Sequence, residues 1–548
     1  MHKKSFYKKA ITKVQATIIA VIIVVVVIAG ATYYLSLPPT PSPSPTPTSS
    51  PTPTYAETIT VTLGVDVPTL DPPQIYSTPA AIVVEHIFDK LVDIDEEGNI
   101  IPELATSWEI SSDGLEYTFH LRKDAKFQDG TPVNASAIVY NVDRMLRQLP
   151  PEENIPRMPL ITYVMMMDHA EAIDEYTVKI VLKYPHAPFL SRIGTSCCGI
   201  VSPTAAKKWG PEEFGEHPVG SGPYKLVEWR HGERIVLERN ENYWGKLPPT
   251  KRIIFVIVPE AATRVTMLEA GDVDLIVSPP TTDIPLLESN PNFIVDKHPS
   301  TRVIYIGMNT QWGPLRDVRV RKALNYAVDK EAIVKTILGG LGVVMDSPCT
   351  KEMFGHYSVG AYPYDPEKAK ELLAEAGYPN GFKVTLHHPT GRYFMDVKIA
   401  EAVQSYLMAV GVDCELITMD WPSYMAIISK PLEETPLQLY LLGWGPWILD
   451  ADQMLYPLFH SSQWPPNGLA DSFYNNSRVD ELIVEATEIT DPEKRCEIYR
   501  EVQEIIMDEA PWIFLHNERF TIVYSADLHD VAVYPIEQFD LISAWKPK

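Results

Sequence analysis

Polar and apolar positions alternate with helical and strand-like spacing from Glu57 to the end of the chain. Several stretches place apolar residues three or four positions apart, which is the spacing of one helix face. The predicted helices cover residues 134–149, 318–338, 365–377 and 491–511. Other stretches are rich in β-branched and aromatic residues, as strands are. The predicted strands cover residues 57–65, 115–121, 176–182, 233–239, 252–258, 303–309 and 437–443.

The ends of several predicted helices are marked by their residue types. Asp365 and Asp491 each precede a proline, so each aspartate is expected to cap a helix that begins with proline. Gly377 and Pro511 are expected to end these two helices. Asp329 predicts a second helix start inside residues 318–338.

The order of these elements limits the fold class. Helices and strands follow one another without a uniform period, and no internal repeat is found. A TIM barrel is therefore not favoured, because it needs a regular alternation of strand and helix. The pattern predicts an α/β body with two lobes, at least one of which carries additional antiparallel strands.

The pattern before Glu57 is different. Residues 16–37 are uncharged and almost wholly apolar, which is long enough for a helix to cross the roughly 30 Å hydrocarbon layer of a membrane. Five lysines lie within residues 1–15, so the positive-inside rule places this basic leader in the cytoplasm and the rest of the chain outside. We therefore expect a single-pass N-terminal transmembrane anchor.

Two other readings of this segment stay open. Ala29-Gly30-Ala31 has the form of a signal-peptidase site, so a cleaved secretory signal is possible from the sequence. The segment also resembles the pilin-like leader of archaeal surface proteins, which implies a cut after Ala10 that leaves the apolar helix in place. Residues 38–54 contain eight prolines in seventeen positions. Residues 38–56 are therefore predicted to form an extended Pro/Ser/Thr-rich stalk.

The charge is distributed unevenly over the 548 residues. The chain has 47 basic and 71 acidic side chains and a formal charge of −24. Without the five N-terminal lysines, 42 basic and 71 acidic residues remain in 57–548, which gives −29. An acidic body of this kind repels phosphate backbones, so nucleic-acid binding is not expected.

The five cysteines do not form a recognisable framework. No CxxC pair occurs, and the scatter resembles neither a zinc module nor a disulfide scaffold. Cys197 and Cys198 are expected to be buried, and so is Cys496 on the helix 491–511. How the thiols pair stays open at this point.

The chain lacks the sequence motifs of common enzymes. There is no G-x-S-x-G elbow, no G-x-x-x-x-G-K-[ST] phosphate loop, no H-E-x-x-H zinc helix and no EF-hand loop. His387 and His388 are neighbours on a predicted strand and would point to opposite faces, so no metal site is expected. Asp450 and Asp452 could form a glycosidase pair, but two structural loop acids are the simpler interpretation. No cofactor is expected.

Motifs along almost all of residues 57–548 resemble the peptide/nickel class, family 5, of extracellular solute-binding proteins that serve ABC importers. The motifs follow the family's order. They are TLDP (69–72), IFDKLVDIDEEGNIIPELATSWEISSDGLEYTFHLRKDAKFQDGTPVNASAIVYNVDRM (87–145), GSGPY (220–224), RNENYWG (239–245), LEAGDVDLI (268–276), MNTQWGPLRDVRVRKALNYAVDKEAIV (308–334) and DPEKAKELLAEAGYPNGFKVTL (365–386).

This resemblance implies a two-lobed, periplasmic-binding-protein-like clamp whose chain crosses the hinge twice. It places lobe I at 57–305 and 517–548, with a subdomain inserted at about 78–215. Lobe II would cover residues 306–516. A ligand would enter the open cleft, and closure of the lobes would be recognised by the permease.

The resemblance also implies where the ligand is held. In dipeptide-binding relatives, an aspartate after a Gly-Trp pair binds the peptide's amino group; here Gly443 and Trp444 are followed at that position by Trp447. Asp450 or Asp452 could take over this role. An arginine that binds the peptide carboxylate in those relatives lies near Thr390, and Arg392 could substitute for it, although a solvated loop arginine is the simpler interpretation.

The tryptophans support a different ligand. Indole rings stack on sugars as well as on peptide side chains, so Trp444 and Trp447 would also suit an oligosaccharide. Together with Asn309, these residues complete the candidate ligand contacts. We therefore predict an extracytoplasmic receptor, monomeric and membrane-anchored, that delivers peptides to the permease subunits and ATPases of an ABC importer. The alternatives are an oligosaccharide receptor and, more remotely, a secreted glycosidase.

Overall fold

The computed structural model describes residues 20–22, 24–27, 29, 55–96, 98–156 and 158–548. The chain divides into two units, Met1–Thr54 and Tyr55–Lys548. The predicted leader (1–15), most of the predicted anchor (16–37) and the stalk up to residue 54 lie outside the described residues. Residues 20–22, 24–27 and 29 are helical. Within the described parts of the chain, none of the helices has both the length and the apolar character needed to cross a membrane.

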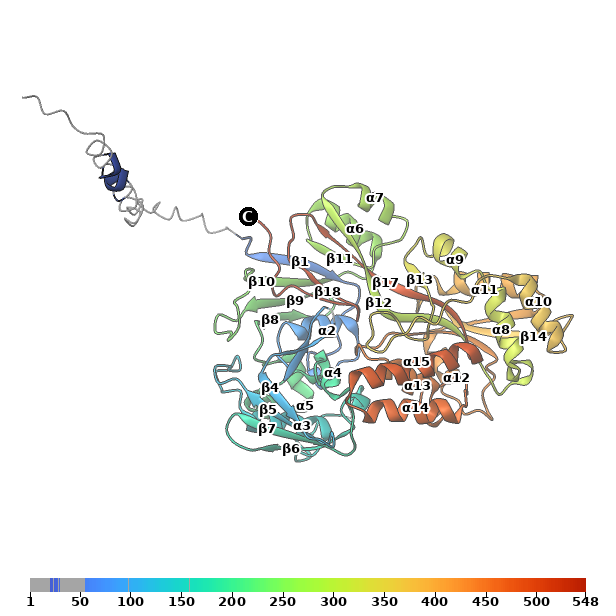
Figure 1. The fold of residues 1–548 in the computed structure, drawn as a ribbon, viewed down its shortest axis with the longest axis horizontal. Coiled ribbons are helices and arrows are strands. Elements are labelled where there is room, and N and C mark those ends of the chain that lie inside the picture. The colour runs from blue at the N-terminus through green and yellow to red at the C-terminus, as the bar shows by residue number, and fades with distance from the viewer. Residues whose placement is uncertain (1–19, 23, 28, 30–54, 97, 157) are drawn as a thin grey trace, which may run out of the picture. The chain divides into compact units, whose positions relative to one another are not determined.

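The unit Tyr55–Lys548 is built on an 11-stranded mixed sheet (Figure 1). The strands that form the path across it are β15 (Asp413–Met419), β14 (Lys383–Pro389), β16 (Leu439–Trp444), β12 (Phe293–Met308), β17 (Trp512–Ser525), β11 (Leu275–Val277), β1 (Thr58–Leu63), β10 (Arg252–Ile257), β9 (Arg234–Arg239) and β8 (Tyr224–Arg230). A short strand, β13 (Gly342–Val344), pairs with β17 outside this path. The predicted α/β character therefore holds.

Two long strands connect the halves of the sheet. β12 and β17 run antiparallel from the pair Phe293–Ser525 to the pair Gly307–Trp512, with a register shift between Pro299 and Val303. On one side of this shift β17 pairs with β11, and on the other side β12 pairs with β16. In Figure 1 the two strands pass through the middle of the unit. We call β12 and β17 the hinge strands.

The buried apolar side chains form two large clusters, one on each side of the hinge strands. One cluster draws on residues 59–275 and 522–544, and the other on residues 303–515. We call these segments lobe I and lobe II. Trp447 and Ile448 are an exception, because they belong to lobe II by position but pack into the cluster of lobe I. The limits predicted from the sequence for the lobes and for the inserted subdomain stay predictions.

Lobe I contains a second, separate sheet of four antiparallel strands in the order β4-β5-β7-β6. Its strands and the neighbouring ribbon are β2 (Val92–Ile94), β3 (Ile100–Pro102), β4 (Ala105–Ile110), β5 (Glu116–Leu121), β6 (Met167–Ala172) and β7 (Thr177–Leu182). The helices of lobe I are α2 (Thr78–Glu85), α3 (Ala135–Leu146), α4 (Phe189–Ile193), α5 (Pro203–Glu213) and α6 (Ala261–Ala270), and α7 (Ile284–Ser289) follows just before the hinge strand β12. A ribbon of β18 (Ala532–Tyr534) and β19 (Gln538–Asp540) follows the second hinge strand.

Lobe II is rich in helices, and the predicted caps form. Asp365 accepts a hydrogen bond from the N–H of Lys368, and Asp491 accepts one from the N–H of Glu493. Asp329 caps a short helix that continues into a π-helix at Ile333–Ile337. The helices are α8 (Val318–Ala327), α9 (Lys330–Ala332), α10 (Pro366–Glu375), α11 (Asp396–Ala409), α12 (Trp421–Ile428), α13 (Asp452–Phe459), α14 (Ser477–Glu488) and α15 (Pro492–Glu509).

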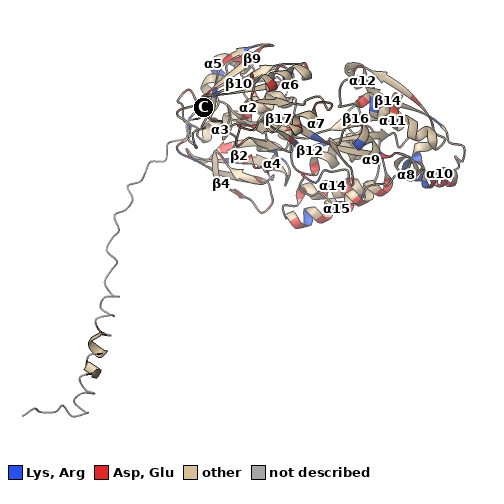
Figure 2. Ribbon diagram, turned by 90° about the horizontal axis from the view of Figure 1, so that it is seen from above, with Lys and Arg blue, Asp and Glu red and all other residues tan. Residues whose placement is uncertain are grey.

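The five cysteines are all free thiols. Cys197 and Cys198 are buried as predicted, but the burial predicted for Cys496 is wrong, since its side chain is exposed. The buried face of α15 runs through Arg495, Tyr499 and Val502. One residue turns a helix by about 100°, so Cys496 lies beside this face and not on it. Asp and Glu residues are frequent along α14 and α15 (Figure 2).

Candidate functional site

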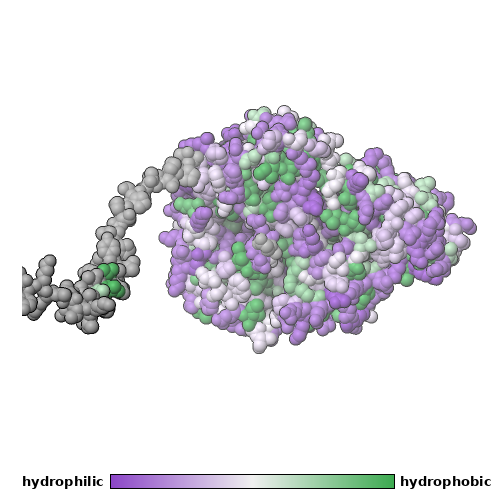
Figure 3. Space-filling model, turned by 45° about the horizontal axis from the view of Figure 1, so that its top comes forward, coloured by the Kyte–Doolittle hydropathy of each residue, from purple (hydrophilic) through white to green (hydrophobic). Residues whose placement is uncertain are grey.

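A cleft of about 480 Å³ lies where the hinge strands pass from one lobe to the other. One face of the unit is largely hydrophilic, with apolar side chains gathered in its hollowed middle (Figure 3). The residues that line the cleft are Leu63, Gly64, Val65, Thr78, Pro79, Ile82, Pro259, Arg264, Val277, Ser278, Pro279, Arg302, Leu341, Arg392, Tyr393, Phe394, Glu518, Arg519, Phe520, Thr521 and Glu537. Both lobes and both hinge strands therefore contribute to it.

An ion pair at the hinge forms one wall of the cleft. Arg302, on β12, donates from Nε and Nη2 to the two carboxylate oxygens of Glu537, at 2.8 and 2.5 Å. Burial disfavours the charged guanidinium, but Glu537 and Glu518 outweigh this effect and hold the pKa of Arg302 above its usual value. A Cβ on Gly445 would lie 2.9 Å from Cζ of Arg302. The guanidinium therefore lies between the β18–β19 turn and the backbone of lobe II.

A second cleft arginine, Arg264, has its hydrogen bonds taken up by backbone carbonyl groups. Its guanidinium donates to the carbonyl oxygens of Val258, Pro259, Val277 and Ser278, at 2.8 to 3.0 Å. Burial lowers the pKa of Arg264. This side chain holds together the loops that follow β10 and β11, so its role is structural.

Arg392, a candidate from the sequence, also lines the cleft. Its Cζ atom lies 5.0 Å from the ring centres of Tyr393 and Trp421, which is the geometry of a cation–π contact. Its backbone N–H is bonded to the carboxylate of Asp396, which positions the loop after β14. Among the residues that the structure describes, no carboxylate lies within ion-pair distance of the Arg392 guanidinium. The charge is therefore available to a ligand.

The two candidate aspartates lie outside the cleft lining and are buried in separate ion pairs. Asp450 is 2% exposed and accepts hydrogen bonds from Arg495, at 3.0 and 2.8 Å, and from the hydroxyl of Tyr499, at 3.1 Å. Asp452 is 1% exposed and pairs with Arg192 of lobe I. Burial disfavours the charge of Asp452, but Arg192 outweighs this and holds its pKa below the usual value. Neither carboxylate is open to a sugar or to an amine.

The two candidate tryptophans also lie outside the cleft lining. Trp447 is 8% exposed and packs into the apolar cluster of lobe I. Trp444 is half-buried against the cluster of lobe II, and its Nε1–H donates to the carbonyl oxygen of Gln453 at 2.9 Å. Contact of either side chain with a ligand stays a prediction.

The two remaining candidates, Gly443 and Asn309, lie in lobe II and take part in hydrogen bonds that involve a backbone carbonyl group. Gly443 lies in β16, and its carbonyl oxygen accepts a hydrogen bond from the hydroxyl of the cleft residue Tyr393 at 3.1 Å. Asn309 is 3% exposed and donates to the carbonyl oxygen of Leu437 at 3.0 Å. Of the candidates from the sequence, the structure thus brings Arg392 to the cleft wall and Gly443 next to it.

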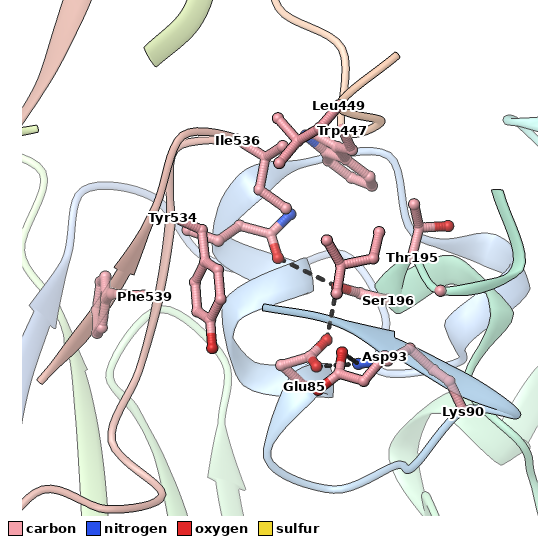
Figure 4. A pocket seen from close by; sticks show the side chains of 13 residues that line it. Glu85, Lys90, Asp93, Thr195, Ser196, Trp447, Leu449, Tyr534, Ile536 and Phe539 are labelled. Atoms are coloured by element: carbon pink, nitrogen blue, oxygen red, sulfur yellow. Dashed lines mark hydrogen bonds and ion pairs between the residues drawn. The ribbon is translucent and has the colours of Figure 1, made fainter. Parts of the chain in front are cut away.

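Trp447 closes a much smaller cavity of about 30 Å³ (Figure 4). Below it, Lys90 forms ion pairs with Glu85 and Asp93, and Ser196 donates a hydrogen bond to Glu85 at 2.9 Å. Burial disfavours the charge of Lys90, but the carboxylates outweigh this and raise its pKa well above the usual value. A cavity of this size holds about one water molecule. This cavity is too small to be a second ligand cleft, and the charged side chains beside it form an internal polar cluster.

The described residues contain no group of three or more His, Cys, Asp or Glu side chains that could hold a metal ion. Both ring nitrogens of His388 have partners, the carbonyl oxygen of Pro389 at 2.9 Å and the hydroxyl of Thr418 at 2.8 Å. In the part of the chain that the structure describes, no cluster of carboxylates or thiols accompanies the pair His387 and His388.

Sequence reasoning missed the charged residues at the hinge, Arg302, Glu518 and Glu537. No local motif marks them, because Arg302 and Glu537 are 235 positions apart in the chain. Arg302 and Glu518 could have been found from their place beside the two predicted hinge crossings, at 305/306 and 516/517, whereas Glu537 lies about twenty residues beyond the second crossing.

Comparisons with known proteins agree on one family. The family model described as "Bacterial extracellular solute-binding proteins, family 5 Middle" matches residues 99–466. The glutathione-binding proteins GsiB of Pectobacterium atrosepticum and of Escherichia coli K12 are each 34% identical over 488 residues, which is 88% of this chain and 93% of the relative.

Solved structures with the same fold are also found. HbpA2 from Haemophilus parasuis superposes with a TM-score of 0.82 at 27% identity, covering 90% of this chain and 100% of that one. The periplasmic binding protein DppA from Helicobacter pylori, in complex with the peptide STSA, gives a TM-score of 0.74 at 28% identity, with 90% and 99% covered.

Proposed function

This chain belongs to the family 5 extracellular solute-binding proteins of ABC transporters, and we propose that the solute it captures is a short peptide. It is a binding protein and not an enzyme, so the glycosidase hypothesis is dropped. The fold is that of the periplasmic binding proteins, and the receptor acts outside the cytoplasm. The finer assignment, to peptides, is supported by the chemistry of the cleft.

The observation that carries this proposal is the open guanidinium of Arg392. It lies at the wall of the interlobe cleft, is supported by Tyr393 and Trp421, and has no carboxylate partner among the described residues. An arginine held in this way binds a ligand carboxylate by two charge-assisted hydrogen bonds. A free peptide always offers a carboxylate at its C-terminus, whereas a neutral sugar offers none.

The balance of charge in the cleft supports the same ligand class. Four arginines and two glutamates line it, although the body carries a net charge of −29. A net positive cleft in an acidic protein favours a ligand with more carboxylates than ammonium groups. Glutathione, the ligand named for the GsiB relatives, has two carboxylates and one ammonium group at neutral pH. Acidic short peptides of this kind are the ligands we propose.

Capture would proceed by closure of the lobes about the hinge strands. The ligand bridges cleft residues of both lobes, so it stabilises the closed state relative to the open one. The closed receptor would then dock on the permease subunits. We further propose that the receptor acts as a monomer tethered by the N-terminal segment 16–37, with its cleft facing outside the cell.

No observation favours the oligosaccharide alternative. It depended on Trp444 and Trp447, and neither lines the cleft. Two aromatic side chains, Tyr393 and Phe394, do line the cleft, but the unpaired guanidinium of Arg392 lies next to them. A neutral sugar would leave this charge uncompensated. Oligosaccharide binding is therefore kept as an outcome of the experiment.

The experiment is a thermal-shift screen of the full-length chain in detergent. A ligand that binds only the folded state raises the melting temperature with its concentration. The panel contains dipeptides, tripeptides, glutathione and oligosaccharides. Stabilisation by peptides, and most by those with two carboxylates, is expected. Stabilisation by oligosaccharides alone, or by no member of the panel, would overturn the proposal.

A further inference from the structure

Glu518 occupies a special position in the cleft, because it lies on a hinge strand between two cavities. It lines the main cleft and also a neighbouring cavity of about 100 Å³. The second cavity is formed by the hinge strands, by β13 and by the chain that follows β13. The residues that line it are Pro299, Ser300, Val343, Val344, Asp346, Cys349, Thr350, Lys351, Glu352, Asn517, Glu518 and Arg519. A group that reaches Glu518 from the cleft therefore has room on both sides.

Glu518 is the cleft carboxylate that lacks a close partner. The other one, Glu537, takes both hydrogen bonds of the Arg302 guanidinium. Glu518 Oε2 is 3.6 Å from Nε of Arg302, which is too long for a hydrogen bond. The Glu518 side chain is 15% exposed, and its Oε1 atom is buried without a hydrogen-bond partner among the described residues. A buried carboxylate oxygen without a donor is costly, so a donor is missing from this place.

Two more buried oxygens without a hydrogen-bond partner belong to residues that line the neighbouring cavity. The hydroxyl of Thr350 and Oε1 of Glu352 are also buried without a hydrogen-bond partner among the described residues. Within 4 Å of Glu352, the described residues supply one cation, the mostly exposed Lys351 at 3.8 Å. Three unsatisfied oxygens around one cavity match a group that brings several N–H donors. An ammonium group, with three N–H bonds and one positive charge, fits this requirement.

The other candidate carboxylates, Asp450 and Asp452, do not offer a binding site for an ammonium group. The family resemblance puts the amine-binding position of dipeptide-binding relatives at Trp447, which carries no charge. Asp450 and Asp452 are buried in ion pairs with Arg495 and Arg192. The ammonium group of a peptide would thus meet no carboxylate in this segment of lobe II.

We propose that Glu518 binds the free ammonium group of the peptide ligand and thereby selects peptides with an unblocked amino group. This inference rests on the proposed function, because it requires that the ligand be a peptide. Arg392 and Arg519 remain for the carboxylates, since Arg519 has no carboxylate within ion-pair distance in the described part of the chain. The cleft then complements a ligand with one ammonium group and two carboxylates.

The experiment compares free and N-acetylated peptides by isothermal titration calorimetry on the full-length chain in detergent at pH 8. The probes are glutathione, trialanine and the N-acetyl derivative of each. The wild-type protein should bind each free peptide about 100-fold more tightly than its acetylated form. Glu518→Gln should reduce this preference to within about threefold, because the substitution removes the negative charge that faces the ammonium group. The control Glu233→Gln, at an exposed turn outside the cleft lining, should keep the full preference.

A second measurement needs no variant. The charged groups around Glu518 are Arg302, Glu537, Arg392, Arg519 and, across the second cavity, Asp346, Lys351 and Glu352. Burial, together with Glu537, raises the pKa of Glu518 to about 7. The preference of the wild type for free over acetylated peptides should therefore decrease as the pH falls below about 7.

Equal binding of free and acetylated peptides by the wild type would overturn the inference while leaving the peptide receptor intact. An undiminished preference in a folded Glu518→Gln protein would do the same, and so would an equal loss of affinity for free and acetylated probes. Absence of binding for all four probes would overturn the proposed function and this inference with it.

Discussion

The carboxylate of Asp452, in lobe II, is buried against the guanidinium of Arg192, in lobe I. Their side chains are 2% and 6% exposed. Two residues earlier, Asp450 pairs with Arg495 inside lobe II. The segment 450–452 is thus bonded to helix α15 through Asp450 and to lobe I through Asp452. This segment is a fixed part of the contact between the lobes.

Replacing Asp452 by Asn should destabilise the protein strongly. The change leaves the buried guanidinium of Arg192 without its counter-charge, and breaking a buried pair in this way costs about 3–5 kcal/mol. The measurement is the free energy of unfolding from denaturant titration at neutral pH.

The control for this prediction is a surface ion pair. Asp508→Asn removes the partner of Lys322 on the surface of lobe II, where the aspartate is 75% exposed. Exposed pairs contribute about 1 kcal/mol or less, so this variant should stay close to the wild type. Equal stability of Asp452→Asn and the wild type would show that the interlobe pair does not contribute.

Trp447→Ala tests whether this side chain packs between the lobes or contacts a ligand. Because Trp447 is 8% exposed within the cluster of lobe I, its truncation should lower the free energy of unfolding by about 3–5 kcal/mol. Trp447→Phe should recover part of the loss. If the ligand-contact prediction is right instead, Trp447→Ala would keep its stability and lose affinity for trialanine.

Much of the fold was predictable because the local signals agree with the structure. The aspartates before Pro366 and Pro492 cap helices as expected, since the side-chain oxygen of each accepts a backbone N–H of the first turn. The hinge strand β17 was missed. Its sequence, WIFLHNERFTIVYS, loses its apolar alternation in the middle, where it passes between the lobes. Its partner β12 is far away in the chain, so only tertiary pairing reveals the strand.

The candidate site was less predictable than the fold. Arg392 could be found because the family resemblance points to its neighbourhood. Asp450 and Asp452 are of the residue type that binds amines, but both carboxylates already form buried ion pairs, with Arg495 and Arg192, and only the structure reveals these pairs. Glu518 carries no local signal, since its importance comes from cavities formed by segments distant in sequence.

Arg392→Gln should weaken the binding of peptides without affecting folding. The guanidinium is exposed at the cleft wall and contacts no carboxylate of the described chain, so its removal leaves no buried charge behind. Affinity for glutathione and trialanine should fall by about 30- to 100-fold, as expected for loss of a charge-assisted pair. Calorimetry would measure this, with Arg500→Gln on the exposed face of α15 as the matched control. Unchanged affinity would remove Arg392 from the site.

Glu518→Gln should change the pH dependence of stability in the absence of ligand. The pKa of Glu518 is raised from 4.5 to about 7, chiefly by burial. The folded state therefore holds a proton that the unfolded state has already lost between these values, and the protein loses this stability as the pH rises through about 7. The glutamine variant does not lose it. Relative to the wild type, the variant should gain up to about 3 kcal/mol between pH 4 and pH 8.

The measurement is the free energy of unfolding of both proteins at pH 4, 6 and 8. Glu233→Gln, at an exposed position, should follow the wild-type curve throughout, because an exposed carboxylate has nearly the same pKa in both states. The sign of the difference decides the outcome. If Glu518→Gln instead becomes less stable relative to the wild type as the pH rises, the ionised carboxylate is stabilised in the unliganded protein by Arg302, and no donor is missing from its place.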